Sequence, residues 1–240
     1  KAHIRLIPST PGLQDQVYVA NVAAVFDEQE HRGSFAVLAR FRARGRPGEE
    51  LAGERFLNDL GFETFHSPYF FEGAADLMAL APGVFVGAVG RTSHEALEWI
   101  GKSFGVKIIE CELTNPYLYH LDCVLFRVGA GEVALVTSAL KTETVKEIEK
   151  YCEVIDVPPD AALSGATNCV RIGSEILCDD NSSLLENNNE LYEHERSKVR
   201  FLESMCNQRG YQLKFFNGSE FLKSGAGLSC MFLKLNDIGY

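Results

Sequence analysis

The sequence predicts an α/β protein built from five copies of one strand–hairpin–helix unit. A helix-like segment that ends in a glycine or a short turn is followed, four times along the chain, by a short strand. After each strand comes a loop and then an apolar run that can fold back as a hairpin. Because one such unit buries too little surface alone, we expect the five to pack radially around a centre as one domain, residues 1–240.

The helix–strand junctions lie at residues 57–66, 100–111, 148–158 and 207–216. A fifth strand is expected at residues 4–8 (IRLIP), where the chain opens without the preceding helix. Two short turns divide apolar runs into hairpins, namely APG at residues 81–83 and GAGE at residues 129–132. The sequence therefore predicts that each unit contributes one hairpin and one further strand.

Capping residues mark the ends of the expected helices. Three are expected N-caps: Ser93, Thr142 and Ser219. Three glycines stand where helices are expected to end: Gly61, Gly105 and Gly210. One stretch breaks the repeat, because residues 179–194 are polar and rich in asparagine. We expect a mobile loop there that enters a long helix over residues 190–209.

The composition excludes several classes of partner. The chain has a formal net charge of -10, which argues against nucleic acid and anionic membranes, since both need a basic face. An acidic protein suits a small cationic substrate. No run of about 18 apolar residues is present, and the first ten residues lack the apolar core of a signal peptide. These features predict a cytoplasmic protein.

The chain has seven cysteines, at positions 111, 123, 152, 169, 178, 206 and 230. They include no CxxC pair, and several lie inside apolar, strand-like runs. Most are therefore expected to be buried, reduced thiols in a reducing compartment. The spacing of cysteine and histidine matches no common zinc-ligand pattern, so no metal site is predicted.

Polar residues of catalytic type recur at one place in the repeat, near the start of the strand that follows the loop. They are Asp15 and Asn21, Glu72 and Asp76, His120 and Asp122, Asn168, and Ser229 and Cys230. Equivalent positions of a radial array converge near its axis. A cysteine–histidine catalytic pair from distant parts of the sequence is therefore expected there. Asp76 and Asn168 we interpret as residues that shape loops.

Six motifs occur in order along the chain: DQVYVAN, ARFRARGRPGEE, FEGAADLM, GRTSHEA, YHLDCVLF and SGAGLSC. Together they resemble the guanidino-group-modifying superfamily, which includes arginine deiminase, dimethylarginine dimethylaminohydrolase, arginine dihydrolase and the amidinotransferases. The resemblance implies a five-bladed α/β propeller of pseudo-symmetric ββαβ units. Only ten residues follow Cys230, so the last blade is expected to be incomplete. Its open edge would favour a homo-oligomer.

The resemblance also implies the catalytic roles. Cys230 resembles the family nucleophile, His120 the general acid/base, and Glu72 the carboxylate that orients the histidine. Cys230 would attack the guanidinium carbon while His120 protonates the departing amine or ammonia. The resulting S-alkylthiouronium adduct would be hydrolysed by a water that His120 activates. This chemistry needs no metal or organic cofactor.

Five further residues are implied to bind the substrate. Asp15 and Asp122 resemble the carboxylates that grip the guanidinium nitrogens. Arg46 and Arg91 resemble arginines that hold the α-carboxylate of the substrate. Asn21 fills the position where arginine dihydrolases carry the asparagine of a TAN motif.

The predicted function is hydrolysis of a small guanidino compound, and free L-arginine is the first choice of substrate. Asn21 favours an arginine dihydrolase over a deiminase. Dimethylarginine hydrolysis and amidino transfer are the enzymatic alternatives. A propeller that binds without catalysing, or a degenerate relative that binds a guanidino ligand weakly, is the non-enzymatic alternative.

Overall fold

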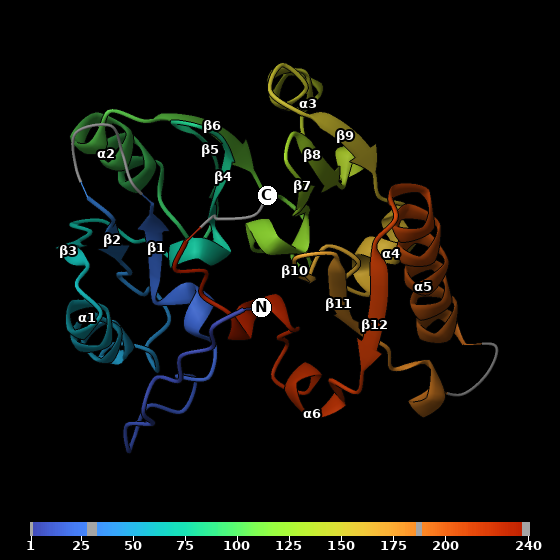
Figure 1. Ribbon diagram of the computed structural model, residues 1–240, viewed down its shortest axis with the longest axis horizontal. Helices are drawn as coiled ribbons and strands as arrows, with labels where there is room; N and C mark the ends of the chain where they lie inside the picture. Colours follow the sequence, from blue (N-terminus) through green and yellow to red (C-terminus); the bar gives the residue numbers. More distant parts are fainter. Residues whose placement is uncertain (1, 28–32, 186–188, 237–240) are drawn as a thin grey trace. The chain divides into compact units, whose positions relative to one another are not determined.

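The computed structural model describes residues 2–27, 33–185 and 189–236, and it has an α/β fold made of mixed three-stranded sheets (Figure 1). The chain divides into two compact units. The first unit is formed by residues 3–112 together with residues 230–236, and the second unit by Leu113–Ser229. The prediction that residues 1–240 make one domain stays a prediction.

All four sheets in the described part of the chain share one topology. The first two strands of each sheet form an antiparallel hairpin, and the third pairs in parallel with the second after a helical crossover. A parallel neighbour requires such a crossover, whereas an antiparallel neighbour needs only a tight turn. The repeat predicted from the sequence is therefore confirmed for four units.

The first unit holds two of these sheets. One contains β1 (Ala23–Phe26), β2 (Phe35–Leu38) and β3 (Glu63–His66), with α1 (Glu49–Asp59) in the crossover. The other contains β4 (Leu77–Ala81), β5 (Val84–Val89) and β6 (Lys107–Glu112), with α2 (His94–Phe104) in the crossover. Two 3-10 turns, η1 (Val19–Asn21) and η2 (Gly73–Ala75), precede β1 and β4.

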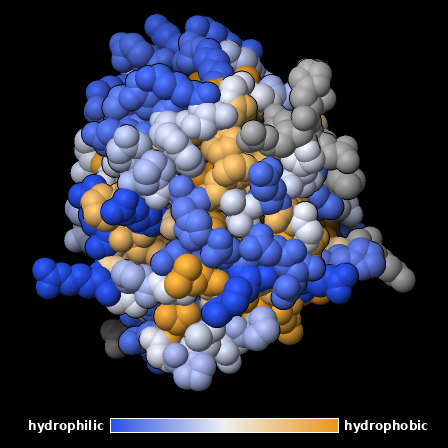
Figure 2. Space-filling view, turned by 90° about the vertical axis from the view of Figure 1, so that its left-hand side faces the viewer, coloured by the Kyte–Doolittle hydropathy of each residue, from blue (hydrophilic) through white to orange (hydrophobic). Residues whose placement is uncertain are grey.

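An aromatic core fixes the two sheets of the first unit to α2. Phe26 and Phe35 stack with their ring centroids 4.7 Å apart, and Phe104 at the end of α2 lies 4.7 Å from Phe35. Leu97 and Ile100 bury the inner face of α2 in the same cluster. On the face shown in Figure 2, apolar side chains are interspersed with polar ones.

The second unit holds the other two sheets. One contains β7 (Leu125–Gly129), β8 (Glu132–Leu135) and β9 (Glu153–Asp156), with α3 (Thr142–Ile148) in the crossover. The other contains β10 (Val170–Ile172), β11 (Glu175–Asp179) and β12 (Gln212–Phe216), with α5 (Glu190–Arg209) in the crossover. The shorter elements are η3 (Leu121–Cys123), η4 (Thr137–Ala139), α4 (Pro159–Leu163), η5 (Ser182–Leu184), α6 (Ser219–Leu222) and η6 (Ser229–Met231).

A buried ion cluster fastens α5, which runs beside α4 and β12 in Figure 1. The Nζ atom of Lys198 lies 2.8 Å from Glu195 Oε1 and 3.4 Å from Asp179 Oδ1. Burial alone would lower the pKa of Lys198, but the surrounding acidic groups outweigh burial and raise it. Within the described residues, none of the helices is both long and apolar enough to cross a bilayer.

Most predicted element boundaries are confirmed. Both short turns, at residues 81–83 and 129–132, connect antiparallel strands, and α5 covers the predicted residues 190–209. Ser93 caps α2 by accepting a hydrogen bond from the Ala96 amide, and Gly105 ends that helix in the left-handed conformation.

Other boundaries differ from the prediction. Thr142 and Ser219 are the first helical residues of α3 and α6, so the N-caps are Lys141 and Gly218. Of the predicted loop at 179–194, residues 182–184 form η5, and residues 186–188 lie outside the described residues.

Residues 4–8 do not form the predicted strand. They belong to none of the described sheets, and Ile4 and Leu6 are 69% and 83% exposed. A strand gains stability from a neighbouring strand and a buried face, and no described strand pairs with this segment.

Gly53 on α1 lies against Val22, the residue directly before β1, and this contact should reverse the usual effect of a glycine-to-alanine change. A Cβ atom at position 53 would lie 2.0 Å from Val22 Cγ1. We expect Gly53→Ala to lower the free energy of unfolding by about 1–3 kcal/mol in a urea titration, although alanine favours helices. Ser103→Ala on the exposed face of α2 is the control and should be neutral or slightly stabilising. A stabilised Gly53→Ala protein would contradict the packing described here.

Candidate active site

Five of the predicted polar residues lie on or beside 3-10 turns that come before the first strand of a hairpin. Asn21 is the last residue of η1, and Glu72 and Asp76 flank η2. His120 precedes η3, and Asp122 is its central residue. Glu72 and His120 thus hold the same position, immediately before the turn, in two different repeats. The polar positions that recur in the sequence therefore correspond to a 3-10 turn that recurs in the structure.

Glu72 is completely buried in the first unit and is held by several neighbours. Asn21 Nδ2 donates to Glu72 Oε2 at 3.4 Å, and Arg46 Nη1 lies 3.8 Å from the same oxygen. The backbone amide of Glu72 donates to Thr92 Oγ1, whose hydroxyl donates to Asp76 Oδ2 at 2.7 Å. Asp76 therefore shapes the loop, through Thr92, while Glu72 presents a fixed carboxylate.

Gly73 allows the two turns of the first unit to touch. Its φ is +63°, and a Cβ atom there would lie 2.6 Å from the backbone oxygen of Asn21. Both the left-handed conformation and the close approach favour glycine. The glycine of the FEGAAD motif is therefore what brings Asn21 beside Glu72.

Arg46 is buried and its guanidinium is already engaged by protein groups. Its Nε and Nη2 atoms donate to Glu49, the shortest distance being 2.6 Å, and Nη2 also donates to the carbonyl of Tyr18. The guanidinium lies 4.4 Å from the Phe41 ring centroid. The predicted role of Arg46, to hold a substrate carboxylate, stays a prediction. In the structure, Arg46 forms a hydrogen-bonded ion pair with Glu49 and places a positive charge near Glu72.

Glu49 is the wholly buried partner of Arg46. Burial raises the pKa of Glu49, Arg46 opposes this rise, and the nearby charge of Asp15 adds to it. Removing Arg46 would leave a charged Glu49 carboxylate buried without its ion-pair partner.

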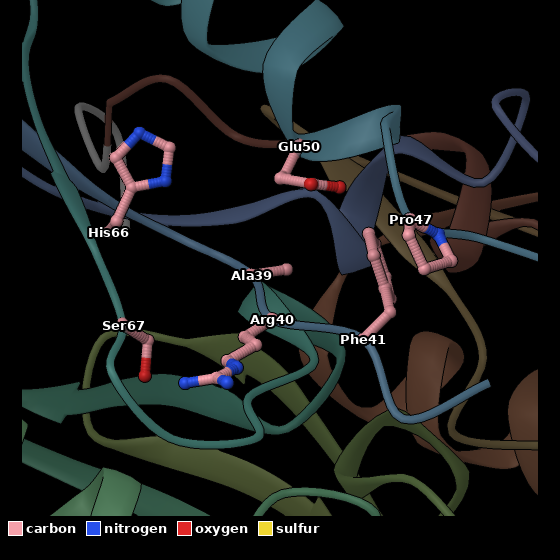
Figure 3. A pocket seen from close by; sticks show the side chains of 7 residues that line it. All are labelled: Ala39, Arg40, Phe41, Pro47, Glu50, His66 and Ser67. Atoms are coloured by element: carbon pink, nitrogen blue, oxygen red, sulfur yellow. The ribbon is translucent and has the colours of Figure 1, made fainter. Parts of the chain in front are cut away.

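A cavity of about 330 Å³ opens next to this cluster in the first unit, and Arg40 extends along it toward Ser67 (Figure 3). The cavity is lined by Ala39, Arg40, Phe41, Pro47, Glu50, His66 and Ser67. Arg40 is exposed and donates to the carbonyl of Pro68. Glu50 accepts the Gly48 amide at 2.7 Å. Arg40 thus presents an exposed guanidinium that could meet an anionic group of a ligand.

Sequence reasoning did not single out Arg40. It lies in the same ARFRARGRP stretch as Arg46, and the arginines there look equivalent in the sequence. The available signal was position. Arg40 comes two residues after a fully buried strand, whereas Arg46 comes just before a helix and can pair with a residue of its first turn.

Three other predicted residues of the first unit are less buried than Glu72 and Arg46. Asp15 is half-buried in the segment before η1. Arg91 is exposed in the turn before the Ser93 cap of α2. Cys230 is half-buried in η6 and directly follows Ser229.

In the second unit, Asp122 is the centre of a buried hydrogen-bonded group. Its Oδ2 atom accepts from Ser229 Oγ at 2.7 Å and from Asn168 Nδ2 at 3.1 Å. Its backbone carbonyl accepts from Thr167 Oγ1 at 2.9 Å. Asn168 Oδ1 in turn accepts the backbone amide of Ser229 at 2.8 Å. Asn168, which the sequence suggested was a loop-shaping residue, therefore connects three segments of this unit.

His120 is buried beside this group, with its ring centroid 4.9 Å from that of Tyr119. The Tyr119 hydroxyl donates to the carbonyl of Gly225 at 2.8 Å. The turn that carries His120 and Asp122 is thus hydrogen-bonded to the SGAGLS segment at two positions, Gly225 and Ser229. The predicted pairing of Glu72 with His120 stays a prediction.

The cysteines differ strongly in their surroundings. Burial raises the pKa of Cys111 to about 12 and the pKa values of Cys152 and Cys206 to about 11. A hydrogen bond with Cys178 and burial raise the pKa of Cys169 well above its usual value. Such thiols supply little thiolate near neutral pH. Among the described residues, no group of three histidine, cysteine or acidic side chains could hold a metal ion.

Comparison with known proteins identifies relatives along almost the whole chain. The chain is 24% identical over 233 residues to N(G),N(G)-dimethylarginine dimethylaminohydrolase of Mycobacterium tuberculosis, covering 97% of this chain and 70% of that protein. It is 23% identical over 248 residues to the bifunctional arginine dihydrolase/ornithine cyclodeaminase ArgZ of Synechocystis, covering 98% of this chain and 31% of ArgZ. No protein-family profile matches the chain.

A solved structure shares the fold. An asparagine-to-serine variant of the N-terminal domain of ArgZ, covalently bound to a reaction intermediate, matches with a TM-score of 0.81 and 22% identity. The match covers 97% of this chain and 79% of that domain. The resemblance to the guanidino-group-modifying superfamily, near arginine dihydrolase and dimethylarginine dimethylaminohydrolase, is therefore confirmed.

Removing Arg46 should destabilise the protein, because Glu49 would remain buried without its ion-pair partner. We expect Arg46→Ala to lower the free energy of unfolding by about 3–5 kcal/mol at neutral pH, because a buried carboxylate loses its counter-charge. The loss should shrink as the pH falls toward 4.5, the ordinary pKa of the carboxyl group, because protonation of Glu49 removes the charge.

Urea titrations at several pH values measure this effect. The matched control is Lys102→Ala, which breaks the exposed pair with Glu98 on α2 and should leave stability nearly unchanged. The double variant Arg46→Met, Glu49→Leu should recover part of the loss. A pH-independent loss in Arg46→Ala would argue against the buried charge as its cause.

Proposed function

We propose that the chain, a relative of dimethylarginine dimethylaminohydrolase and ArgZ by sequence and fold, is a cysteine-dependent hydrolase of a guanidino compound. It would act on a C–N bond of free L-arginine, its first-choice substrate, on the scaffold of a five-bladed α/β propeller. The observation that carries the proposal is the set of hydrogen bonds by which buried Asp122 and Asn168 hold Ser229, the residue directly before Cys230. Four sheets of identical topology support the propeller.

Cys230 is the proposed nucleophile. A thiolate is needed, and the raised pKa values of Cys111, Cys152, Cys169 and Cys206 make those thiols poor choices. Cys230 is half-buried and stands at the end of the glycine-containing segment that the family resemblance marks. The covalent intermediate in the ArgZ domain supports a covalent route in a protein of the same fold.

Carboxylates are proposed to hold the substrate cation. A guanidinium is planar and presents paired N–H donors, which carboxylates accept with defined geometry. Asp122 is fixed through Oδ2 by two donors, so its orientation is set before a substrate arrives. Asp15 is the second proposed carboxylate. Arg46 and Arg91 were the predicted partners of the substrate carboxylate, and Arg40, which lines the open cavity, is a further candidate for that role.

The proposed reaction has two stages. Cys230 Sγ forms a bond to the guanidinium carbon, and protonated His120 gives its proton to the nitrogen that leaves as ammonia. Glu72 is the proposed partner that orients His120. In the second stage His120 takes a proton from water, the resulting hydroxide attacks the S-alkylthiouronium carbon, and the C–S bond breaks. The thiolate is restored and a ureido product, citrulline from arginine, is released.

Asn21 decides, in this proposal, whether a second ammonia follows. It donates to the buried carboxylate of Glu72, so its amide would lie at the reacting end of the substrate and not at the solvent side. We therefore favour an arginine dihydrolase, which releases ornithine, carbon dioxide and two ammonia molecules. The second candidate is dimethylarginine hydrolysis, which the relative of that name supports. Amidino transfer and ligand binding without catalysis are the remaining alternatives.

The direct test is ammonia release from L-arginine by the wild-type protein, with the amino-acid products identified by mass. Cys230→Ser should lower the rate by at least about 10³-fold, because the nucleophile is removed. Cys152→Ser is the matched control, since Cys152 is also half-buried and its thiol donates to the carbonyl of Ile148 on α3, and it should retain most of the activity.

Each product has a distinct meaning. Ornithine from the wild type supports the dihydrolase, and citrulline alone keeps the cysteine mechanism but rejects the role of Asn21. Turnover of dimethylarginine and not of arginine supports the second candidate. No product from any guanidino compound, or full activity in Cys230→Ser, would overturn the proposal.

A further inference from the structure

We propose that Asn168 is a positioning residue that sets the geometry of both Asp122 and the chain entering Cys230. Its amide group bridges the carboxylate of Asp122 and the backbone amide of Ser229. The kinetic consequence of this bridge rests on the proposed function, whereas the bridge itself is a property of the second unit alone.

Asn168, Asp122 and Ser229 form a closed ring of hydrogen bonds, which includes the backbone amide of Ser229. Asn168 Nδ2 donates to Asp122 Oδ2 at 3.1 Å, Ser229 Oγ donates to the same oxygen at 2.7 Å, and the Ser229 amide donates to Asn168 Oδ1 at 2.8 Å. Asn168 is 6% exposed and Asp122 is 2% exposed. Only an amide side chain of this length supplies a donor to the carboxylate and an acceptor to the backbone at once.

The segment before Cys230 is pressed against Asn168. A Cβ atom at Gly227 would lie 2.4 Å from Asn168 Oδ1. Gly225 has a φ of +80°, and its carbonyl accepts the Tyr119 hydroxyl. The backbone is therefore fixed at Gly225 by Tyr119, at Gly227 by contact, and at Ser229 by two hydrogen bonds.

This arrangement matters because a nucleophile must be held in a narrow range of positions. Cys230 is joined to Ser229 by one peptide bond, so any motion of the Ser229 backbone also moves the cysteine. A misplacement of roughly 1 Å can cost about 10²-fold in rate. Three hydrogen bonds within one small group restrain it more tightly than a single bond would, and each of these bonds is 3.1 Å or shorter.

Two substitutions separate the two halves of the bridge. Asn168→Ala removes both hydrogen bonds, and we expect kcat/KM for the guanidino substrate to fall about 10²-fold, mostly in kcat. Asn168→Asp keeps an oxygen for the Ser229 amide but places a second carboxylate beside Asp122. That variant should mainly raise KM, because Asp122 is the proposed grip on the cation.

A buried asparagine elsewhere in the second unit provides the matched control. Asn181 is 5% exposed, and its Nδ2 atom donates to Asp179 Oδ2 at 2.6 Å, so it also bonds a buried aspartate. Asn181→Ala should lower stability as Asn168→Ala does, but leave kcat and KM unchanged.

The exchange rate of the Ser229 amide hydrogen measures its hydrogen bond to Asn168 without any substrate. We expect the Ser229 amide to exchange faster in Asn168→Ala and to keep its protection in Asn168→Asp and Asn181→Ala. The rate at which iodoacetamide alkylates Cys230 should change in Asn168→Ala only.

Kinetic constants of Asn168→Ala that match those of Asn181→Ala, or an unchanged Ser229 exchange rate, would overturn the inference. If the wild type turns over no guanidino compound, the proposed function fails. Exchange and alkylation then still decide the role of Asn168.

Discussion

The short turn before each hairpin is the constraint on which the rest of the structure depends. It is a 3-10 turn at η1, η2 and η3, and it ends where a buried strand begins. A polar side chain on such a turn is carried by backbone that the following sheet holds in place. Glu72 and His120 take the same position on two of these turns, and the packing of η1 on η2 requires a glycine at position 73. The chemistry proposed for this chain uses residues that the repeat itself positions.

Burial of charge is the second theme, and each buried carboxylate has donors matched to it. Glu49 has Arg46, and Asp122 has Asn168 and Ser229. Removing one partner from such a group costs more than the pair contributes, because the remaining charge stays buried. Carboxylates held in this way keep their orientation without a ligand, which is the preorganisation that binding of a planar cation requires.

The repeat, the hairpins and the long helix could be predicted because periodicity and turn residues are local signals. The strand at residues 4–8 could not be judged, since its formation depends on a partner that the sequence does not reveal. Side-chain partners were equally hidden. Arg46 and Arg40 look alike in one basic stretch, yet the first is buried against Glu49 and the second lines a cavity. The bridging role of Asn168 follows from contacts with residues 46 and 61 positions away, which no local pattern records.

The central claim is that Cys230 becomes covalently bonded to the guanidinium carbon during turnover. The most direct measurement is peptide mass spectrometry of protein that has been quenched with acid while it acts on L-arginine. The account predicts a Cys230 peptide heavier by the mass of arginine less one ammonia, present in the wild type and absent from Cys230→Ser. Turnover without such an adduct on Cys230, or an adduct on another cysteine, would contradict it.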